Sequence, residues 1–303
     1  MAQDEKKQAR RVRRVRHSKS IAPLRPSAGL EAWYRKKLRQ EIKKMSDSVE
    51  YWLRAVYRSR ESEIIAEDAS PAREIWDDLK RTMARWQKHF DELGEKLARR
   101  FVGRLSRAEK ARFEQALKDA GWTVKFRTPR GVNNIMQSAI IENVNLIKKI
   151  PKDYLEQVGT IVNIGIQNGK DLDYITRELH KRYEITDRRA NMIARDQNNK
   201  VTAALDREHA NHLGITDAVW VYTYGSKEPR HTHVEMDGKR FKLSEGLYDP
   251  NPKVARKIQP AELVNCRCMY RMLLPEIDYS GDFDENGKWA DRRQSPDHPN
   301  FEG

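Results

Sequence analysis

Cysteine is scarce in this sequence, with two residues in 303, Cys266 and Cys268, and one residue between them. A disulfide across a single intervening residue would be strained, so the pair is a poor disulfide framework and indicates a reducing compartment. Long apolar runs are also lacking, and none approaches the ~20 residues that span a bilayer. The basic N-terminus has no apolar segment of the kind found in secretory signals. We therefore expect neither export nor a membrane partner.

The composition is polar, with 34% charged and 38% hydrophobic residues and a mean hydropathy of −0.90. Such a balance suits elongated helices, which have much surface relative to their core. The formal net charge of +14 indicates a polyanionic partner. How the charge is distributed says more than its sum.

The basic residues gather at the N-terminus, where residues 6–19 include no acid. The cations of this segment are Lys6, Lys7, Arg10, Arg11, Arg13, Arg14, Arg16 and Lys19. We predict that residues 1–26 form a disordered basic arm that binds DNA phosphates without reading sequence. A solvated tail or a localisation signal remains an alternative. Residues 276–303 form an acidic tail.

Helical periodicity dominates residues 27–127, which we predict to be an elongated helical region. Two apolar stripes recur at steps of three or four: Leu30, Tyr34, Leu38, Ile42, Met45, Val49, Trp52 and Val56, then Ile75, Leu79, Met83, Trp86, Phe90, Leu93, Leu97 and Phe101. Helical spacing makes these stripes core, or a seam between copies of the chain. Ser70-Pro71 predicts the start of the second helix. Ser106 and Glu109 have the spacing of a capping box and predict a shorter helix after them.

Further helices are predicted from residue 130 onward. One runs through Ile135 and ends at Pro151, because proline disfavours a helix interior. The next ends near Asn168-Gly169, and another opens at Asp171-Leu172. Thr186 is predicted to cap a longer helix that ends at Gly214.

A change of pattern follows Gly214. Ala218–Tyr222 is rich in β-branched and aromatic residues and predicts a strand. Met236-Asp237-Gly238 predicts a tight turn, Lys239–Phe241 the returning strand, and Val264–Leu274 a third strand. The predicted fold is therefore mainly α with a small C-terminal β-rich module (α+β).

An ordered series of short blocks runs through the second half of the chain. It begins at Asn143–Pro151 and continues through Arg189–Asp196, which includes Arg195, and Leu213-Gly214-Ile215. It then includes Trp220, Arg230, His233, Asp237, Gly238, Asn265, Cys266, Arg267 and Cys268. Over roughly residues 140–275 this series resembles the phage head morphogenesis family, the Mu F-like minor head proteins. Two departures are Gln197, where many members carry Thr-Glu after Ala-Arg, and an insertion-like stretch at Tyr248–Lys257.

The resemblance implies that residues 130–275 form a Mu F-like module in a structural protein of a tailed-phage head, which is not an enzyme. Its implied partners are the portal protein, capsid or scaffold proteins, and phage DNA bound without sequence preference. Its implied location is the capsid interior of the virion, and the host cytoplasm during assembly. Formation of a homo-oligomer is left open.

Two histidines and both cysteines invite a chemical interpretation. His231, His233, Cys266 and Cys268 could bind a structural zinc ion, because a strand would place both imidazoles on one face. The alternative is a packed thiol pair, with His233 bonded to a backbone carbonyl. A nuclease-like enzyme using this cluster, or a standalone nucleic-acid-binding protein, are the competing functions.

Two arginines near the cluster are given a structural role. We expect Arg195 or Arg230 to form a buried pair with a carboxylate, because guanidinium groups bind carboxylates bidentately. Asp196 and Asp237 are the candidate carboxylates. Such a pair would tie the helix that enters the module to the hairpin.

Overall fold

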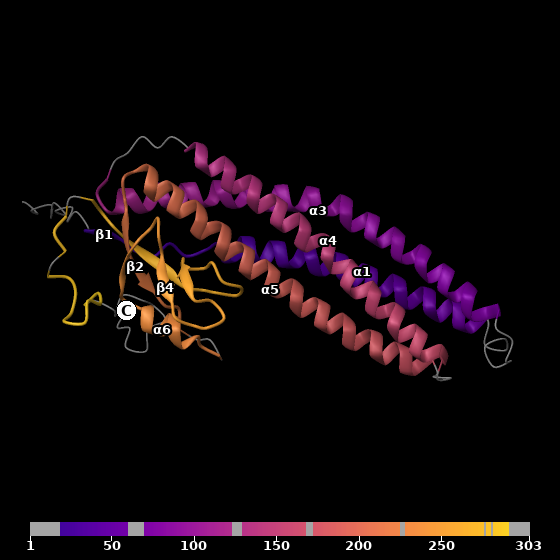
Figure 1. The fold of residues 1–303 in the computed structure, drawn as a ribbon. Helices are drawn as coiled ribbons and strands as arrows, with labels where there is room; N and C mark the ends of the chain where they lie inside the picture. Colours follow the sequence, from indigo (N-terminus) through magenta and orange to yellow (C-terminus); the bar gives the residue numbers. More distant parts are fainter. Residues whose placement is uncertain are drawn as a thin grey trace, which may run out of the picture.

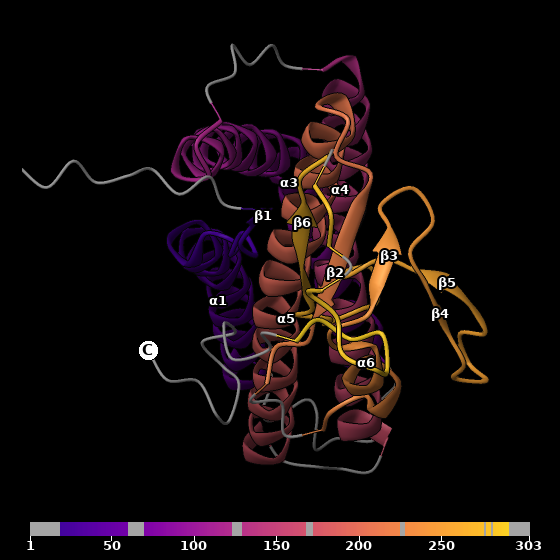
Figure 2. The same cartoon turned by 90° about the vertical axis from the view of Figure 1, so that its left-hand side faces the viewer.

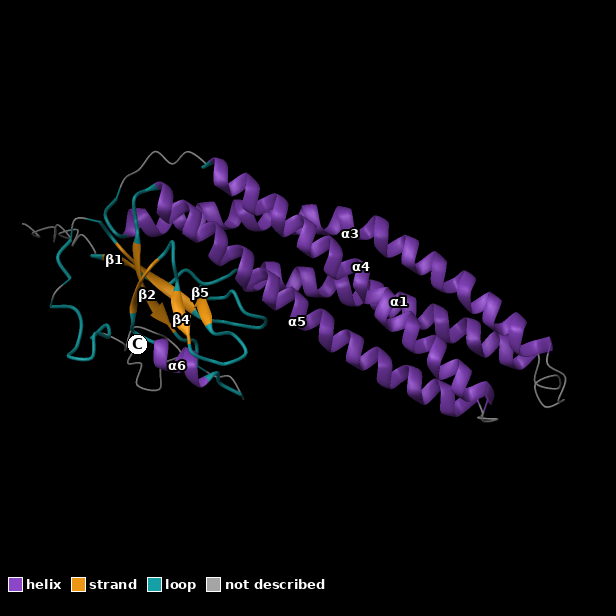
Figure 3. Ribbon diagram, viewed as in Figure 1, coloured by secondary structure: helices purple, strands orange, loops and turns teal. Residues whose placement is uncertain are grey.

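Four long helices form an elongated bundle with a small β module at one end (Figure 1). The computed structural model describes residues 19–59, 70–122, 129–167, 172–224, 228–275, 277–279 and 281–290. The long helices are α1 (Ala28–Ser59), α3 (Ser70–Asp119), α4 (Arg130–Gln167) and α5 (Leu172–His212). Figure 3 shows that the strands lie together at one end of the bundle. The predicted fold class is confirmed.

The helices share one core. The α1 stripe is buried from Leu30 to Val49, as predicted, and ends on Leu53 with Trp52 half-buried beside it. Tyr34 of α1 stacks on Phe101 of α3, with ring centroids 4.1 Å apart. Buried residues of α4 and α5 belong to the same cluster. The boundary predicted near residues 127–130 therefore lies in the connection between two helices of one bundle.

Pro151 does not end a helix, contrary to the sequence prediction, because α4 continues through it to Gln167. Ile150 before the proline and Tyr154 after it are each 1% exposed, and the buried face continues to Val158. A proline inside a helix costs about 3 kcal/mol. Each large apolar side chain that the continued helix buries stabilises the fold by roughly 1.5–3 kcal/mol. This burial offsets the cost of the proline.

The two capping predictions inside helices are also wrong. Ser106 and Glu109 lie within α3, and the Glu109 side chain is buried instead of turning back to the backbone of Ser106. Thr186 lies within α5, where its hydroxyl donates to the carbonyl of Arg182, 3.0 Å away. Bonding to the carbonyl four residues earlier is how threonine is accommodated inside a helix.

The main sheet has four antiparallel strands in the order β1-β6-β2-β3. They are β1 (Ser20–Ile21), β2 (Asp217–Val221), β3 (Arg240–Lys242) and β6 (Met269–Leu273). A separate hairpin, β4 (Leu247–Asp249) and β5 (Arg256–Ile258), projects beyond β3 (Figure 2). This hairpin fills the stretch that departs from the family pattern.

Both predicted tails are shorter than expected. Ser20 and Ile21 fall within the predicted arm but form β1, which pairs with β6, and Ile21 is 2% exposed. In the acidic tail, Tyr279 and Trp289 pack against Val219 and Leu273 of the sheet. Chain segments from both ends therefore complete the β module.

None of the described helices combines the length and the apolarity that crossing a bilayer requires.

Candidate functional site

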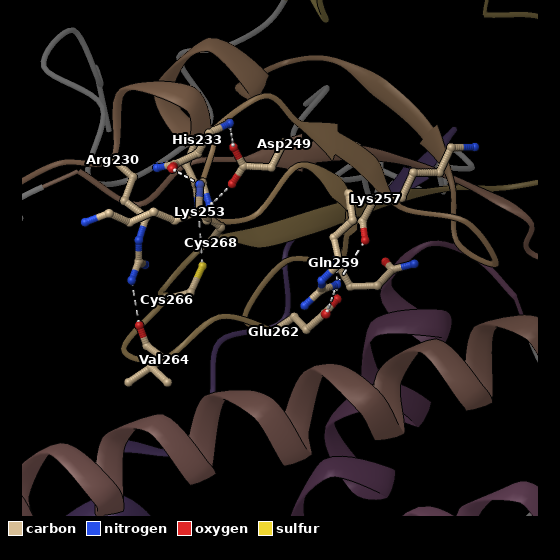
Figure 4. Close-up of polar contacts among 12 residues, drawn as sticks. Arg230, His233, Asp249, Lys253, Lys257, Gln259, Glu262, Val264, Cys266 and Cys268 are labelled. Carbon is tan, nitrogen blue, oxygen red and sulfur yellow. Dashed lines mark hydrogen bonds and ion pairs between the residues drawn. The ribbon is translucent and has the colours of Figure 1, made fainter.

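Four buried side chains meet in the β module around His233, which lies in the short helix α6 (His231–Met236). Its Nδ1 atom is 3.6 Å from the sulfur of Cys266 and 3.5 Å from that of Cys268. On the other side of the ring, Nε2 is 3.4 Å from Oδ2 of Asp249, at the end of β4. Figure 4 shows the imidazole between the carboxylate and the sulfurs. The pair of cysteines and His233 come together as the sequence indicated.

His231 does not join this group, because the His-Thr-His segment is helical and not a strand. Two residues along a helix turn the side chain by about 200°. His233 is therefore 1% exposed whereas His231 is exposed. The predicted bond from His233 to a backbone carbonyl is likewise replaced by the contact with Asp249.

The two cysteines differ in protonation. Hydrogen bonds from Cys268 and, to a smaller extent, the neighbouring His233 together lower the pKa of Cys266 to about 5 despite burial. Burial raises the pKa of Cys268 well above its usual range, and the neighbouring Cys266 raises it further. Trp220 closes one side, with its ring edge-on to His233 at 5.5 Å. The cluster thus offers a cysteine with a lowered pKa, a second cysteine and an imidazole in a buried site, and these groups are ligands for soft metal ions.

The segment that carries the cysteines is fastened to α5. The backbone N–H of Asn265 donates to Oδ1 of Asp196 at 2.6 Å, and the side chain of Asn199 donates to the carbonyl of Cys266 at 3.2 Å. Asn265 has φ +59°, a left-handed conformation that asparagine tolerates better than most residues. The hydroxyl of Thr223, just after β2, donates to the carbonyl of Arg267 at 2.7 Å.

The expected arginine–carboxylate pair does not form. Asp196 pairs with Lys200 at 2.9 Å. Asp237 accepts hydrogen bonds from the backbone N–H of Tyr222 at 2.8 Å and the hydroxyl of Tyr224 at 3.2 Å. These bonds already occupy both carboxylates, and Arg195 is half-buried.

Arg230 performs a different structural task. Its guanidinium donates to the carbonyl of Val264, 2.9 Å away, which joins the start of α6 to the cysteine segment (Figure 4). The predicted turn at Gly238 is present, with φ +80° and an N–H that donates to the carbonyl of Trp220 at 2.9 Å. Backbone carbonyls, and not carboxylates, therefore accept both of these bonds.

Most of the predicted DNA-binding residues, from Lys6 to Arg16, lie outside the described part of the chain. Lys19 is described, and its ammonium group is 3.1 Å from the carboxylate of Asp282. The last cation of the basic segment is therefore paired with a residue of the acidic tail.

Sequence reasoning missed Asp249 and a second buried polar cluster. No sequence motif pointed to Asp249, because it lies in the insertion-like stretch Tyr248–Lys257. The second cluster joins α3 and α5: Glu109 and His209 are 3.2 Å apart, and Asp206 is 3.5 Å from Arg112. A signal was available, since Leu105, Glu109 and Phe113 share one helical face. Glu109 interrupts an otherwise apolar stripe.

The sequence was compared with known proteins and with models of protein families. An uncharacterized protein of Haemophilus influenzae strain Rd is 27% identical over 269 residues, which cover 86% of this chain and 56% of that protein. The chain thus spans about half the length of the curated relative that it matches. No solved structure matches it. Residues 156–271, from the second half of α4 to β6, match the family described as Phage Mu protein F like protein, which confirms the resemblance over that segment.

Proposed function

We propose that this chain is a minor structural protein of a tailed-phage head, where it joins the portal or the inner capsid wall to packaged DNA. The observation that carries the proposal is the family match, which covers α5 and nearly all of the β module. A Mu F-like segment supports a role in head morphogenesis. The contacts with portal, shell and DNA are the specific part of the proposal.

The arrangement of the bundle suits a bridging role. The helices extend away from the β module, so the two ends of the molecule are well separated (Figure 1). Because β1 is part of the module, the basic segment that precedes residue 19 joins the chain at the module end. DNA would therefore be bound near the module. The far end of the bundle is then left for a protein neighbour.

The protein contact is tested by affinity purification from infected or induced host cells. A tagged chain should bring down the portal protein, identified by mass spectrometry. The tag on an unrelated helical protein is the control. If neither portal nor capsid proteins are enriched over the control, the proposed bridging role is wrong.

The DNA contact is tested by neutralising the arm. Seven cations from Lys6 to Arg16 would be replaced by glutamine, which leaves β1 intact. The logarithm of the wild-type binding constant should fall linearly with the logarithm of the salt concentration. The slope should be about −0.9 per phosphate neutralised, and binding should show no sequence preference. The variant should bind weakly and lose most of that slope. Replacing Lys36 and Lys37, exposed on α1, is the matched control and should change little. Equal binding by both variants would refute the arm as the contact.

The histidine–cysteine cluster favours a structural role over a nuclease. Both ring nitrogens of His233 face protein groups, the sulfurs on one side and Asp249 on the other. The side chain is also buried. A general base for DNA hydrolysis must reach its substrate. We therefore infer that this cluster stabilises the module.

A further inference from the structure

The ligand-forming atoms of His233, Cys266 and Cys268 lie within 4.8 Å of one another, and all three residues are buried. Zinc binds sulfur at about 2.3 Å and imidazole nitrogen at about 2.0 Å, which in a tetrahedron separates the two ligand atoms by roughly 3.5 Å. The nitrogen–sulfur distances here are 3.6 Å and 3.5 Å. Both nitrogen–sulfur distances therefore match an edge of a zinc tetrahedron.

We propose that His233, through Nδ1, and the sulfurs of Cys266 and Cys268 bind a zinc ion. The proposal does not depend on the role in the phage head. It also differs from the set expected from the sequence, because His231 is exposed on the other side of α6 and supplies no ligand.

Asp249 provides a second, independent indication. A histidine that binds metal through one ring nitrogen usually directs the other at a carboxylate, which fixes the tautomer and the ring orientation. Nε2 of His233 is 3.4 Å from Oδ2 of Asp249, and both side chains are almost fully buried, at 2% and 1% exposed. With the proton on Nε2, the lone pair of Nδ1 is directed at the sulfurs. This orientation leaves Nδ1 available to a metal ion.

Three protein ligands leave the fourth tetrahedral position to a water molecule. The ion would join three separate pieces of the module: α6, the segment before β6, and, through Asp249, the β4–β5 hairpin. Asp196 and Asn199 hold the cysteine segment against α5. Zinc would therefore fix the hairpin and α6 relative to the end of the bundle, and its binding free energy would add to folding.

Metal analysis of the full-length protein, purified without chelator or added metal, tests the proposal. We expect about one zinc per chain. After chelation, Co²⁺ should produce the near-ultraviolet absorption of cobalt–thiolate bonds, and zinc should displace it. A metal-free protein that takes up no Co²⁺ with both thiols reduced would overturn the proposal. A disulfide between Cys266 and Cys268 under reducing purification would overturn it equally.

Three variants that keep both cysteines test the assigned geometry even if cysteine variants fail to fold. His231→Ala should retain zinc at wild-type affinity. His233→Ala should lose it. Asp249→Asn should still bind, about 10–100-fold more weakly, because it loses only the orienting carboxylate. Equal loss of zinc in the His231 and His233 variants, or wild-type affinity in the Asp249 variant, would contradict the assigned geometry.

Discussion

Glu109 of α3 and His209 of α5 face each other at 3.2 Å, and each side chain is 1% exposed. Asp206, one turn before His209, is buried as well and lies 3.5 Å from the guanidinium of Arg112. Burial raises the pKa of Glu109 and raises that of Asp206 well above its usual range, and the hydrogen bond between the two acids raises the latter further. Burial lowers the pKa of His209. The bundle thus buries two acids with raised pKa values and an imidazole with a lowered pKa beside the β module.

Asp206→Asn should make the protein less sensitive to rising pH. A carboxyl with a raised pKa binds its proton more tightly in the folded state. Its contribution to stability is full below the unfolded pKa, about 4, and is lost as pH rises through the folded pKa. Asparagine stays neutral. The unfolding free energy of the variant relative to wild type should therefore increase as the pH rises above about 4.

Chemical denaturation at several pH values measures this difference. Glu184→Gln, exposed on the same helix, is the control and should give a nearly constant difference. A constant or falling difference for Asp206→Asn would show that the buried acid is not held in its neutral form.

Gln197→Glu should destabilise the protein at neutral pH. The buried Gln197 donates to the carboxylate of Glu142 at 2.8 Å and accepts from the side chain of Asn143 at 2.8 Å. A glutamate at position 197 would lose the donor and face a like charge, at a cost of about 1–3 kcal/mol. This network accounts for glutamine at this position, because one side chain there both donates and accepts.

The double variant Glu142→Gln/Gln197→Glu should recover most of that loss, because the donor and acceptor exchange places. Unfolding free energies of the two single variants and the double variant form a cycle that isolates the pair. If the double variant is no more stable than Gln197→Glu alone, the two side chains do not interact.

Two glycine substitutions should have opposite signs. Gly214 ends α5 with φ +75°, and an alanine there would be strained by about 1–2 kcal/mol even though its Cβ would meet nothing. Gly103 lies inside α3, where an added Cβ would meet only Arg107 at 3.9 Å. Alanine at 103 should stabilise by roughly 0.5–1 kcal/mol. Thermal unfolding of both variants measures these effects. A Gly214→Ala variant at least as stable as wild type would contradict the left-handed helix end, and a destabilised Gly103→Ala variant would contradict the open space inside α3.

Ile21→Ala should destabilise the β module. Ile21 belongs to a two-residue strand, yet it is 2% exposed and aligned with Met272 in β6. Truncating a buried isoleucine typically costs about 2–5 kcal/mol. Lys19→Gln, which removes only the exposed pair with Asp282, is the matched control. A variant as stable as this control would mean that β1 does not contribute to the folded module.

Local patterns in the sequence predicted much of this architecture. The apolar stripe of α1, the strand at β2 and the turn at Gly238 were confirmed because each is encoded by neighbouring residues. Pro151 misled the prediction because its local cost is outweighed by packing with other helices, which a local pattern does not contain. Within the site, the sequence indicated that His233 and the two cysteines come together, because all three lie in one short region of the chain.

What the sequence did not reveal depends on contacts between distant segments. Ser20 pairs with Leu273 across most of the chain, and two residues are too few to show strand periodicity. His233 meets Asp249 only because the β4–β5 hairpin folds back over α6. His231 lies outside the cluster because α6 is helical. Strands precede and follow this segment, so its local sequence did not indicate a helix.

The presence of the protein in phage particles tests the central claim most directly. Quantitative mass spectrometry of purified procapsids and mature virions should detect peptides from α1 to β6 at a low, reproducible ratio to the major capsid protein. Their absence from both particles, while the intact chain is abundant in the same lysate, would contradict a role in the phage head.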